Sequence, residues 1–113
     1  VDGVVEHREY RAGTYQAAWL DKASEHNEQA SLGISTPYGR ILVRQIAGLI
    51  ARRIVTDAFE GDKIERGERI GLIRFGSRVE LFVPMHWEVT CAVGDRTRVG
   101  ATILARLPVR LEP

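Results

Sequence analysis

The sequence predicts an all-β, or mainly β, domain built as a small barrel or sandwich. Short apolar runs recur along its 113 residues and are separated by glycine-containing turns, a pattern typical of that class. A hairpin signal supports the prediction, because Pro37 and Gly39 separate the apolar runs 32–36 and 41–47. A repeated turn-and-strand pattern in the second half of the chain supports it as well.

The expected strands follow one another between turn-forming residues. Ala12 and Gly13 end the first strand, and Gly48 allows a bend after the hairpin. The polar stretch 21–29 forms either one short helical turn or a structured loop. The eight expected strands cover residues 4–10, 32–36, 41–47, 50–58, 69–75, 78–83, 88–92 and 101–107.

The repeat consists of GDKIERGERI at 61–70 and GDRTRVGATI at 94–103. In each copy an aspartate follows the first glycine, a second glycine comes six residues after the first, and an isoleucine ends the copy. A Gly-Asp pair forms a tight turn, and the second glycine permits a positive φ where the chain turns again. The repeat therefore predicts two pseudo-repeated turn-strand units, as in barrel-sandwich-hybrid domains such as the biotin and lipoyl carriers.

Composition indicates one folded domain, which we assign to residues 1–113. The chain is 44% hydrophobic and 27% charged, so it is apolar enough to bury a core. Its net charge of +1 gives no general electrostatic reason to bind nucleic acid, which is not expected as a partner. The longest uninterrupted apolar run, 46–51, is too short to cross a membrane.

No metal site is expected. Cys91 is the only cysteine, which excludes an intrachain disulfide and a cysteine metal cluster. His7, His26 and His86 lack the spacing of metal ligands. Each of these histidines is more typical of a polar surface or loop residue.

The dipeptide Gly76-Ser77 is a candidate for self-cleavage. Gly76 has no side chain to block an approach to its carbonyl, and the Ser77 hydroxyl lies one peptide bond away. Attack of the hydroxyl on the carbonyl would convert the amide to an ester, and elimination would then leave a pyruvoyl group. The same dipeptide is also typical of an ordinary turn or strand end, so its chemistry depends on the rest of the chain.

Three runs give the chain a family resemblance: LDKASEHNE at 20–28, QIAGLIARRI at 45–54 and GERIGLIRFGSRV at 67–79. In order and spacing they resemble the short, single-domain branch of the phosphatidylserine decarboxylases, in which an arginine follows the serine. The resemblance implies self-cleavage between Gly76 and Ser77, with Ser77 becoming the covalent pyruvoyl group, the cofactor of the enzyme. It implies decarboxylation of phosphatidylserine to phosphatidylethanolamine, with the substrate amine held on that group as a Schiff base.

The same resemblance implies a set of binding residues. Arg78 and Arg52 are expected to contact the lipid phosphate or the substrate carboxylate, and solvated strand-edge charges are the alternative. Asn27, Glu28 and Gln45 are polar residues of the resembling runs, and Asn27 and Gln45 are expected to line the site. The alternative for these polar groups is support of loop backbone.

The resemblance also implies partners. The substrate is a phospholipid, so the enzyme is expected at a membrane surface, on the cytoplasmic face of the cell membrane, and a homo-oligomer is left open. The apolar segment 82–87 is either a lip that contacts the bilayer or part of the core. In the family an aspartate and a histidine upstream of the serine assist self-cleavage. Asp2 falls after the segment that carries them, so we expect a C-terminal portion that joins an upstream part, or a cleaved partner chain, of the same precursor.

Two other classes stay open. One is an uncleaved binding module of the biotin or lipoyl type, which needs a lysine at a hairpin tip. Lys63 follows Gly61-Asp62 but has no flanking methionine, so the carrier motif is absent. The other is a catalytically inactive relative of the decarboxylases.

Overall fold

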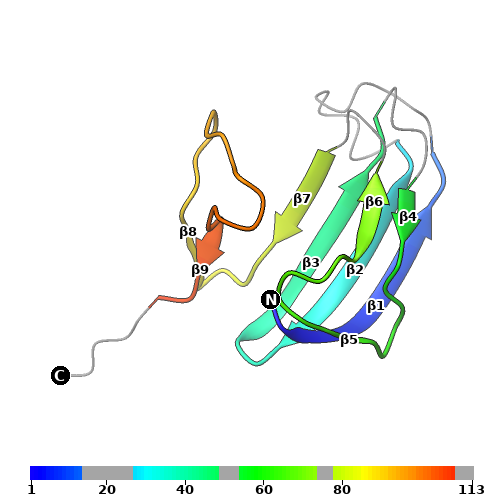
Figure 1. The fold of residues 1–113 in the computed structure, drawn as a ribbon, viewed down its shortest axis with the longest axis horizontal. Helices are drawn as coiled ribbons and strands as arrows, with labels where there is room; N and C mark the ends of the chain where they lie inside the picture. Colours follow the sequence, from blue (N-terminus) through cyan, green and yellow to red (C-terminus); the bar gives the residue numbers. More distant parts are fainter. Residues whose placement is uncertain (14–26, 49–53, 74–77, 109–113) are drawn as a thin grey trace.

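The computed structural model describes residues 1–13, 27–48, 54–73 and 78–108. All regular structure in these ranges is β, so the predicted fold class is confirmed (Figure 1). The strands form a five-stranded antiparallel sheet of order β5-β1-β2-β3-β7 and two smaller pairs, β4–β6 and β8–β9. Their bounds are β1 Gly3–Arg11, β2 Gln29–Thr36, β3 Gly39–Ile46, β4 Ile54–Thr56, β5 Lys63–Ile64, β6 Gly71–Ile73, β7 Arg78–Phe82, β8 Glu88–Val89 and β9 Ala105–Arg106.

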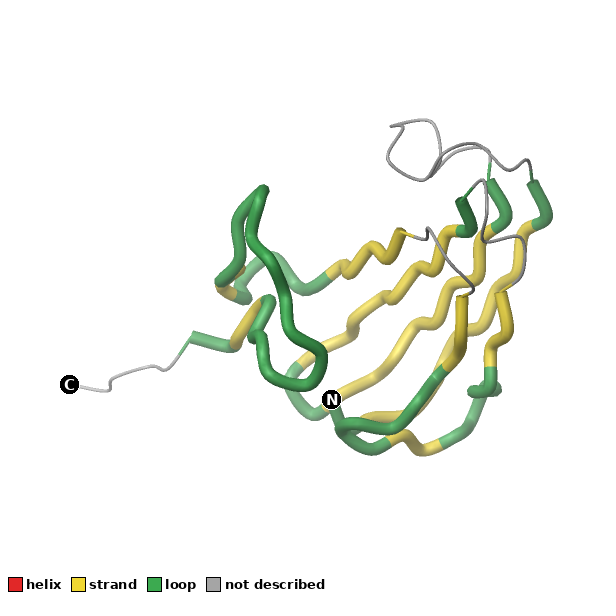
Figure 2. The backbone as a smooth tube through the Cα atoms, turned by 45° about the horizontal axis from the view of Figure 1, so that its top comes forward, coloured by secondary structure: helices red, strands yellow, loops and turns green. Residues whose placement is uncertain are grey.

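The large sheet curls into a half-barrel, and the β4–β6 pair lies across its concave side (Figure 2). Alternate residues of β2 and β3 point to that side, because side chains alternate between the two faces of a strand. Leu32 pairs with Val43 and Ile34 with Ile41, and all four belong to the core or pack against it. The core is completed by Val5, Ala58, Ile64, Ile70, Val83 and Trp87.

The predicted hairpin is confirmed. Thr36 pairs directly with Gly39, which leaves a two-residue loop between β2 and β3. Thr36 Oγ1 accepts a hydrogen bond from the Tyr38 amide at 3.1 Å and donates one to the Gly39 carbonyl at 2.6 Å. Gly39 has a φ of 139°, and a Cβ there would come within 2.9 Å of Pro84 Cγ, so only glycine fits this position.

The sequence repeat is also visible in the structure. The Phe59 amide donates to Asp62 Oδ2 at 2.9 Å, and the Ala92 amide donates to Asp95 Oδ2 at 2.8 Å. The four glycines of the repeat all have positive φ: Gly61 89°, Gly67 84°, Gly94 93° and Gly100 73°. The two turns therefore have the same construction, although only the first copy contains a strand, β5, and contributes residues to the core.

Several predicted strands are shorter than expected. Within the described residues, strand geometry is confined to β4 of the predicted 50–58, β6 of 69–75, β8 of 88–92 and β9 of 101–107. Residues 50–53, 74 and 75 lie outside the described residues, as do 21–26 of the polar stretch; Gln29, its last residue, begins β2. The sequence did not predict β5, which pairs with Gly3 and Val4 of β1.

The β8–β9 pair and the turns between its strands form a lobe beside the large sheet (Figure 1). Val93 and Val99 in this lobe are fully exposed, as is Met85 in the segment that leads to it. Cys91 is half-buried in the lobe. The core thus lies between the large sheet and the β4–β6 pair, and not in the lobe.

Candidate functional site

Six strand ends lie at one end of the large sheet: the end of β1, the start of β2, the end of β3, the start of β4, the end of β6 and the start of β7. Ile46 pairs with Gln29 on one side and with Arg78 on the other. Ser77 directly precedes Arg78, the first residue of β7, in the sequence. Ser77 itself lies outside the described residues, together with Gly76 and Arg52.

Asn27 closes the β2–β3 ladder at this end. It is fully buried, and its Nδ2 donates a 2.7 Å hydrogen bond to the carbonyl of Ala47. The Ala47 amide in turn donates to the Glu28 carbonyl at 3.0 Å. The Asn27 side chain therefore supports backbone just past β3, which was the alternative to a direct role in the site.

Glu28 joins three segments at the same end. Its carboxylate accepts hydrogen bonds from the Tyr10 hydroxyl at 2.7 Å and from the Ile54 amide at 3.2 Å. Glu28 as a whole residue is only 7% exposed, so these bonds replace much of the solvation that a carboxylate loses on burial. Glu28 thus ties the end of β1 and the start of β4 to the start of β2.

Gln45 presents a buried polar group on the concave face. It pairs with Ala30 and Val79, is 8% exposed, and its Oε1 has no hydrogen-bond partner among the described residues. A Cβ added to Gly71 would lie 3.1 Å from both Oε1 and Nε2, so β6 begins directly against this carboxamide. An unpaired buried acceptor costs about 1–3 kcal/mol. The Gln45 carboxamide oxygen is therefore an acceptor that no described residue uses.

Arg78 lies on the convex face and has a carboxylate partner. Its Nη2 contacts Glu80 Oε2 at 2.8 Å, while Arg44 Nη1 contacts Glu80 Oε1 at 3.4 Å. One carboxylate thus bridges two guanidinium groups on neighbouring strands. The predicted site residues Asn27, Gln45 and Arg78 meet at the same end of the sheet, but Gln45 and Arg78 leave it on opposite faces.

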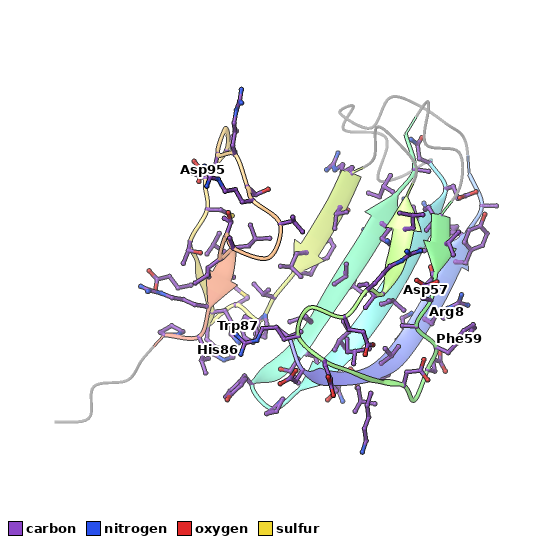
Figure 3. The ribbon with its side chains drawn as sticks, in the orientation of Figure 1. Arg8, Asp57, Phe59, His86, Trp87 and Asp95 are labelled. Carbon is purple, nitrogen blue, oxygen red and sulfur yellow. The ribbon has the colours of Figure 1, made fainter. Side chains whose placement is uncertain are left out.

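The described histidines do not join this cluster. His7 is exposed and contacts Glu9 at 3.2 Å, and His86 lies beyond the far end of β7 (Figure 3). His26 lies outside the described residues. Among the residues that the structure describes, no group of three acidic, histidine or cysteine side chains is placed to hold a metal ion.

The structure also tests the predictions for the apolar segment 82–87 and for Lys63. In the segment 82–87, Phe82 and Met85 are exposed, whereas Trp87 packs against the core. Lys63 pairs with Val4 inside β5, so it does not stand at the tip of a hairpin as a carrier lysine would. Within the described ranges, none of the chain forms a helix with the length and apolar character needed to span a membrane.

Tyr10 and Arg44 are the site neighbours that the sequence did not reveal. Tyr10 lies eighteen residues before Glu28, and the two meet only because β1 and β2 pair in a particular register. Arg44 reaches Glu80 through the pairing of β3 with β7. No local signal in the sequence identifies either contact.

The comparisons with known proteins agree on one family. The family model described as phosphatidylserine decarboxylase matches residues 1–105. The phosphatidylserine decarboxylase proenzyme of Salinibacter ruber is 49% identical over 107 residues, which cover 94% of this chain and 47% of that protein. The proenzyme of Symbiobacterium thermophilum is 50% identical over 109 residues, covering 96% and 51%. That of Nitrobacter winogradskyi is 53% identical over 106 residues, covering 93% and 43%.

The chain therefore spans about half the length of the curated relatives it matches. No solved structure gives a significant match.

Proposed function

Because the chain belongs to the phosphatidylserine decarboxylase family, we propose that it is the part of such an enzyme that carries the self-cleavage site. The proposal assigns the cut to the peptide bond between Gly76 and Ser77. It assigns pyruvoyl-dependent conversion of phosphatidylserine to phosphatidylethanolamine to the complete enzyme. The relatives are named proenzymes, which supports a precursor that must be processed.

The main structural support is the place of the dipeptide in the topology. β6 pairs with β4 in the small sheet, and β7 pairs with β3 in the large sheet. Residues 74–77 therefore connect two strands that are paired separately. A cut in this connection leaves the hydrogen bonds of both ladders unbroken, so processing is compatible with the fold.

Self-cleavage requires the serine side chain, the adjoining carbonyl and one water molecule. Ser77 Oγ attacks the Gly76 carbonyl carbon, the C–N bond breaks, and the freed nitrogen takes up the hydroxyl proton. Loss of the Ser77 α-proton then breaks the Cβ–Oγ bond and releases Gly76 as a carboxylate. The resulting dehydroalanine amine takes a proton at Cβ and becomes an imine, to which water adds; ammonia then leaves, so residue 77 ends as a pyruvoyl group with a methyl group at Cβ.

Once formed, the pyruvoyl group supplies an electron-accepting carbonyl for loss of carbon dioxide. The chain's own residues bind and orient the lipid. Arg78 supplies a guanidinium for the phosphate or carboxylate of the headgroup, and Arg52 supplies a second from the segment just before Ile54. Gln45 Oε1 accepts a hydrogen bond from the substrate ammonium group; the lack of a partner for this buried acceptor among the described residues supports that role. Asn27 stabilises the backbone at one side of the site through its hydrogen bond to the Ala47 carbonyl.

A membrane lipid as substrate requires contact with a bilayer, which we place at the cytoplasmic face of the cell membrane. The exposed Phe82 and Met85 supply apolar contact beside β7. The remaining part of the precursor, as an uncleaved segment or as a cleaved partner chain, supplies the acid–base groups that assist self-cleavage.

Intact-mass analysis of the full-length protein tests the proposal. We expect two chains that separate between Gly76 and Ser77, the smaller one with a blocked N-terminus that reacts with phenylhydrazine. The variant Ser77→Ala should remain one chain and release no carbon dioxide from phosphatidylserine vesicles. Ser35→Ala, on β2 at the opposite end of the sheet, is the matched control and should be processed normally. A wild-type protein that is active while uncut would overturn the mechanism, and one that is uncut and inactive would indicate an inactive relative.

A further inference from the structure

The convex face of the large sheet carries a small polar cavity beside Arg44. Its volume is about 60 Å³. The side chains that line it come from β1, β2 and β3, and all are polar or charged: Glu9, Arg11, Gln29, Ser31 and Arg44. The strand register brings them together, because Ser31 pairs with both Glu9 and Arg44, and Gln29 pairs with Arg11. The cavity is therefore a product of the sheet and not of a loop.

The Arg44 guanidinium is fixed in place but is incompletely paired. Its Cζ lies 5.0 Å from the centroid of the Phe82 ring, and its Nη1 makes a long 3.4 Å contact to Glu80. Its Nε is buried and has no hydrogen-bond partner in the described part of the chain. The Nε–H group of Arg44 therefore lacks an acceptor among the described residues. A buried donor on a charged group without an acceptor is costly, so binding of an acceptor there would be favourable.

We propose that Arg44 and this cavity bind an oxyanion, the phosphate of a phospholipid headgroup or a free phosphate ion. A guanidinium presents parallel N–H groups that match a phosphate oxygen pair. The volume corresponds to about two water molecules of liquid, so it admits a compact oxyanion and leaves the remainder of a larger ligand outside. The Ser31 hydroxyl and the Gln29 carboxamide supply neutral donors at the same place.

Among the described residues that line the cavity, the charged side chains are two arginines and one glutamate. Arg11 and Arg44 face Glu9, whose carboxylate contacts His7 Nε2 at 3.2 Å. The negative charge of Glu9 repels a bound oxyanion and so lowers the affinity of the cavity for it. Removal of the Glu9 charge should therefore strengthen anion binding, whereas removal of the Arg44 charge should weaken it.

The cavity connects to the proposed function through Glu80. This carboxylate bridges Arg44 and Arg78, and Arg78 is bonded to Ser77. Arg78 is the first residue of β7 and directly follows Ser77 in the sequence, so Glu80 links the cavity to the strand that begins next to the proposed cleavage site. The proposal that the cavity binds the phosphate of a phospholipid headgroup rests on the proposed function. The proposal that it binds a free phosphate ion does not.

Titration of the full-length protein with inorganic phosphate at constant ionic strength, followed by the Arg Nε–Hε resonances in NMR spectra, tests the site. We expect saturable binding that shifts one resonance, which Arg44→Gln removes, with affinity lowered about tenfold or more. Glu9→Gln should tighten binding. Arg40→Gln is the matched control, since Arg40 lies on the same strand and face and pairs with Glu6 at 3.1 Å; binding should not change.

Wild-type protein without saturable phosphate binding, or Arg44→Gln that binds phosphate as wild type does, overturns the proposal. If Arg44→Gln fails to fold, Ser31→Ala decides the matter, because it removes one donor of the cavity and a small volume; unchanged affinity in a folded Ser31→Ala protein also counts against the site.

Glycerophosphoserine separates the two sources of phosphate. If it competes with inorganic phosphate and binds more tightly, the site serves the headgroup, and Arg44→Gln should then raise KM for phosphatidylserine while self-cleavage stays normal. If inorganic phosphate binds and the diester does not, the site serves free phosphate. Either result supports the oxyanion site, and neither depends on whether the protein cleaves itself.

Discussion

The Asn27 side chain donates a 2.7 Å hydrogen bond to the carbonyl of Ala47, and both residues are fully buried. This bond extends the β2–β3 ladder by one side-chain link beyond Ile46, the last residue of β3. It holds the chain at the point where it leaves the large sheet, beside the start of β7. The candidate site is therefore bounded by backbone that a buried amide fixes.

Replacement of Asn27 should destabilise the protein. Asn27→Ala leaves the Ala47 carbonyl without this donor in a buried place, at a cost of about 1–3 kcal/mol. Asn27→Asp should cost at least as much, because a carboxylate oxygen would face a carbonyl oxygen. Urea denaturation of both variants measures the loss, with the exposed Thr97→Ala as control. Equal stability of Asn27→Ala and wild type would show that the bond contributes nothing.

The Tyr10–Glu28 contact should be worth about 1.5–3 kcal/mol, as for a hydrogen bond to a charged group. Tyr10→Phe removes the donor while retaining the ring, so urea denaturation should show a loss in this range. Glu28→Gln retains one acceptor oxygen for the Ile54 amide and should cost less than Glu28→Ala. In a double-mutant cycle the losses of Tyr10→Phe and Glu28→Ala should not add, and full additivity would contradict a direct interaction.

Gln45 should show opposite effects on stability and activity. Gln45→Met has nearly the same shape and removes the unpaired acceptor, so we expect unchanged or increased stability, by up to about 1 kcal/mol. Self-cleavage or decarboxylation should slow about tenfold or more if Oε1 contacts a reacting or bound group. Thermal unfolding and carbon dioxide release from the same preparation provide both readouts. Full activity of the Gln45→Met variant would reduce Gln45 to a packing residue.

Gly71→Ala tests how β6 lies against its neighbours. A Cβ there would come within 2.6 Å of the Val55 carbonyl and 3.1 Å of the Gln45 carboxamide. The strand must shift to accept it, which should cost about 1–3 kcal/mol. Gly61→Ala is a useful comparison, since its Cβ would meet no atom within 4 Å and only its φ of 89° opposes the change. Equal stability of Gly71→Ala and wild type would show that β6 can move away from the Val55 carbonyl without cost.

The sequence predicted β1 and the β2–β3 hairpin because their signals are local, namely the Ala12-Gly13 turn that ends the first strand and the Pro37 and Gly39 turn between two apolar runs. It did not predict β5, because two residues become a strand only through pairing with Gly3 and Val4, far away in the chain. The strands of the second half were predicted too long for the same reason. Their apolar residues continue past the ladder, and a strand ends where its partner ends.

For the candidate site, the sequence predicted which residues are involved but not how their side chains are oriented. The family resemblance predicted Asn27, Gln45 and Arg78 as site residues, and all three lie at one end of the sheet. Their orientation depends on register, which local sequence does not encode. Gln45 pairs with Val79, so Arg78, one residue earlier, necessarily leaves on the other face. The link from Arg78 through Glu80 to Arg44 follows from that register alone.

The ladder between β3 and β7 has a consequence for a chain cut before residue 77. β7 would then belong to a different polypeptide from every other strand of the large sheet, held by pairs from Leu42–Phe82 to Ile46–Arg78 and by Val83 and Trp87 in the core. Unfolding would release two molecules, and recovery of the native state would become a second-order process whose yield rises with protein concentration. Loss of the smaller molecule would also expose the edge of β3, where strands of other molecules could add to the sheet.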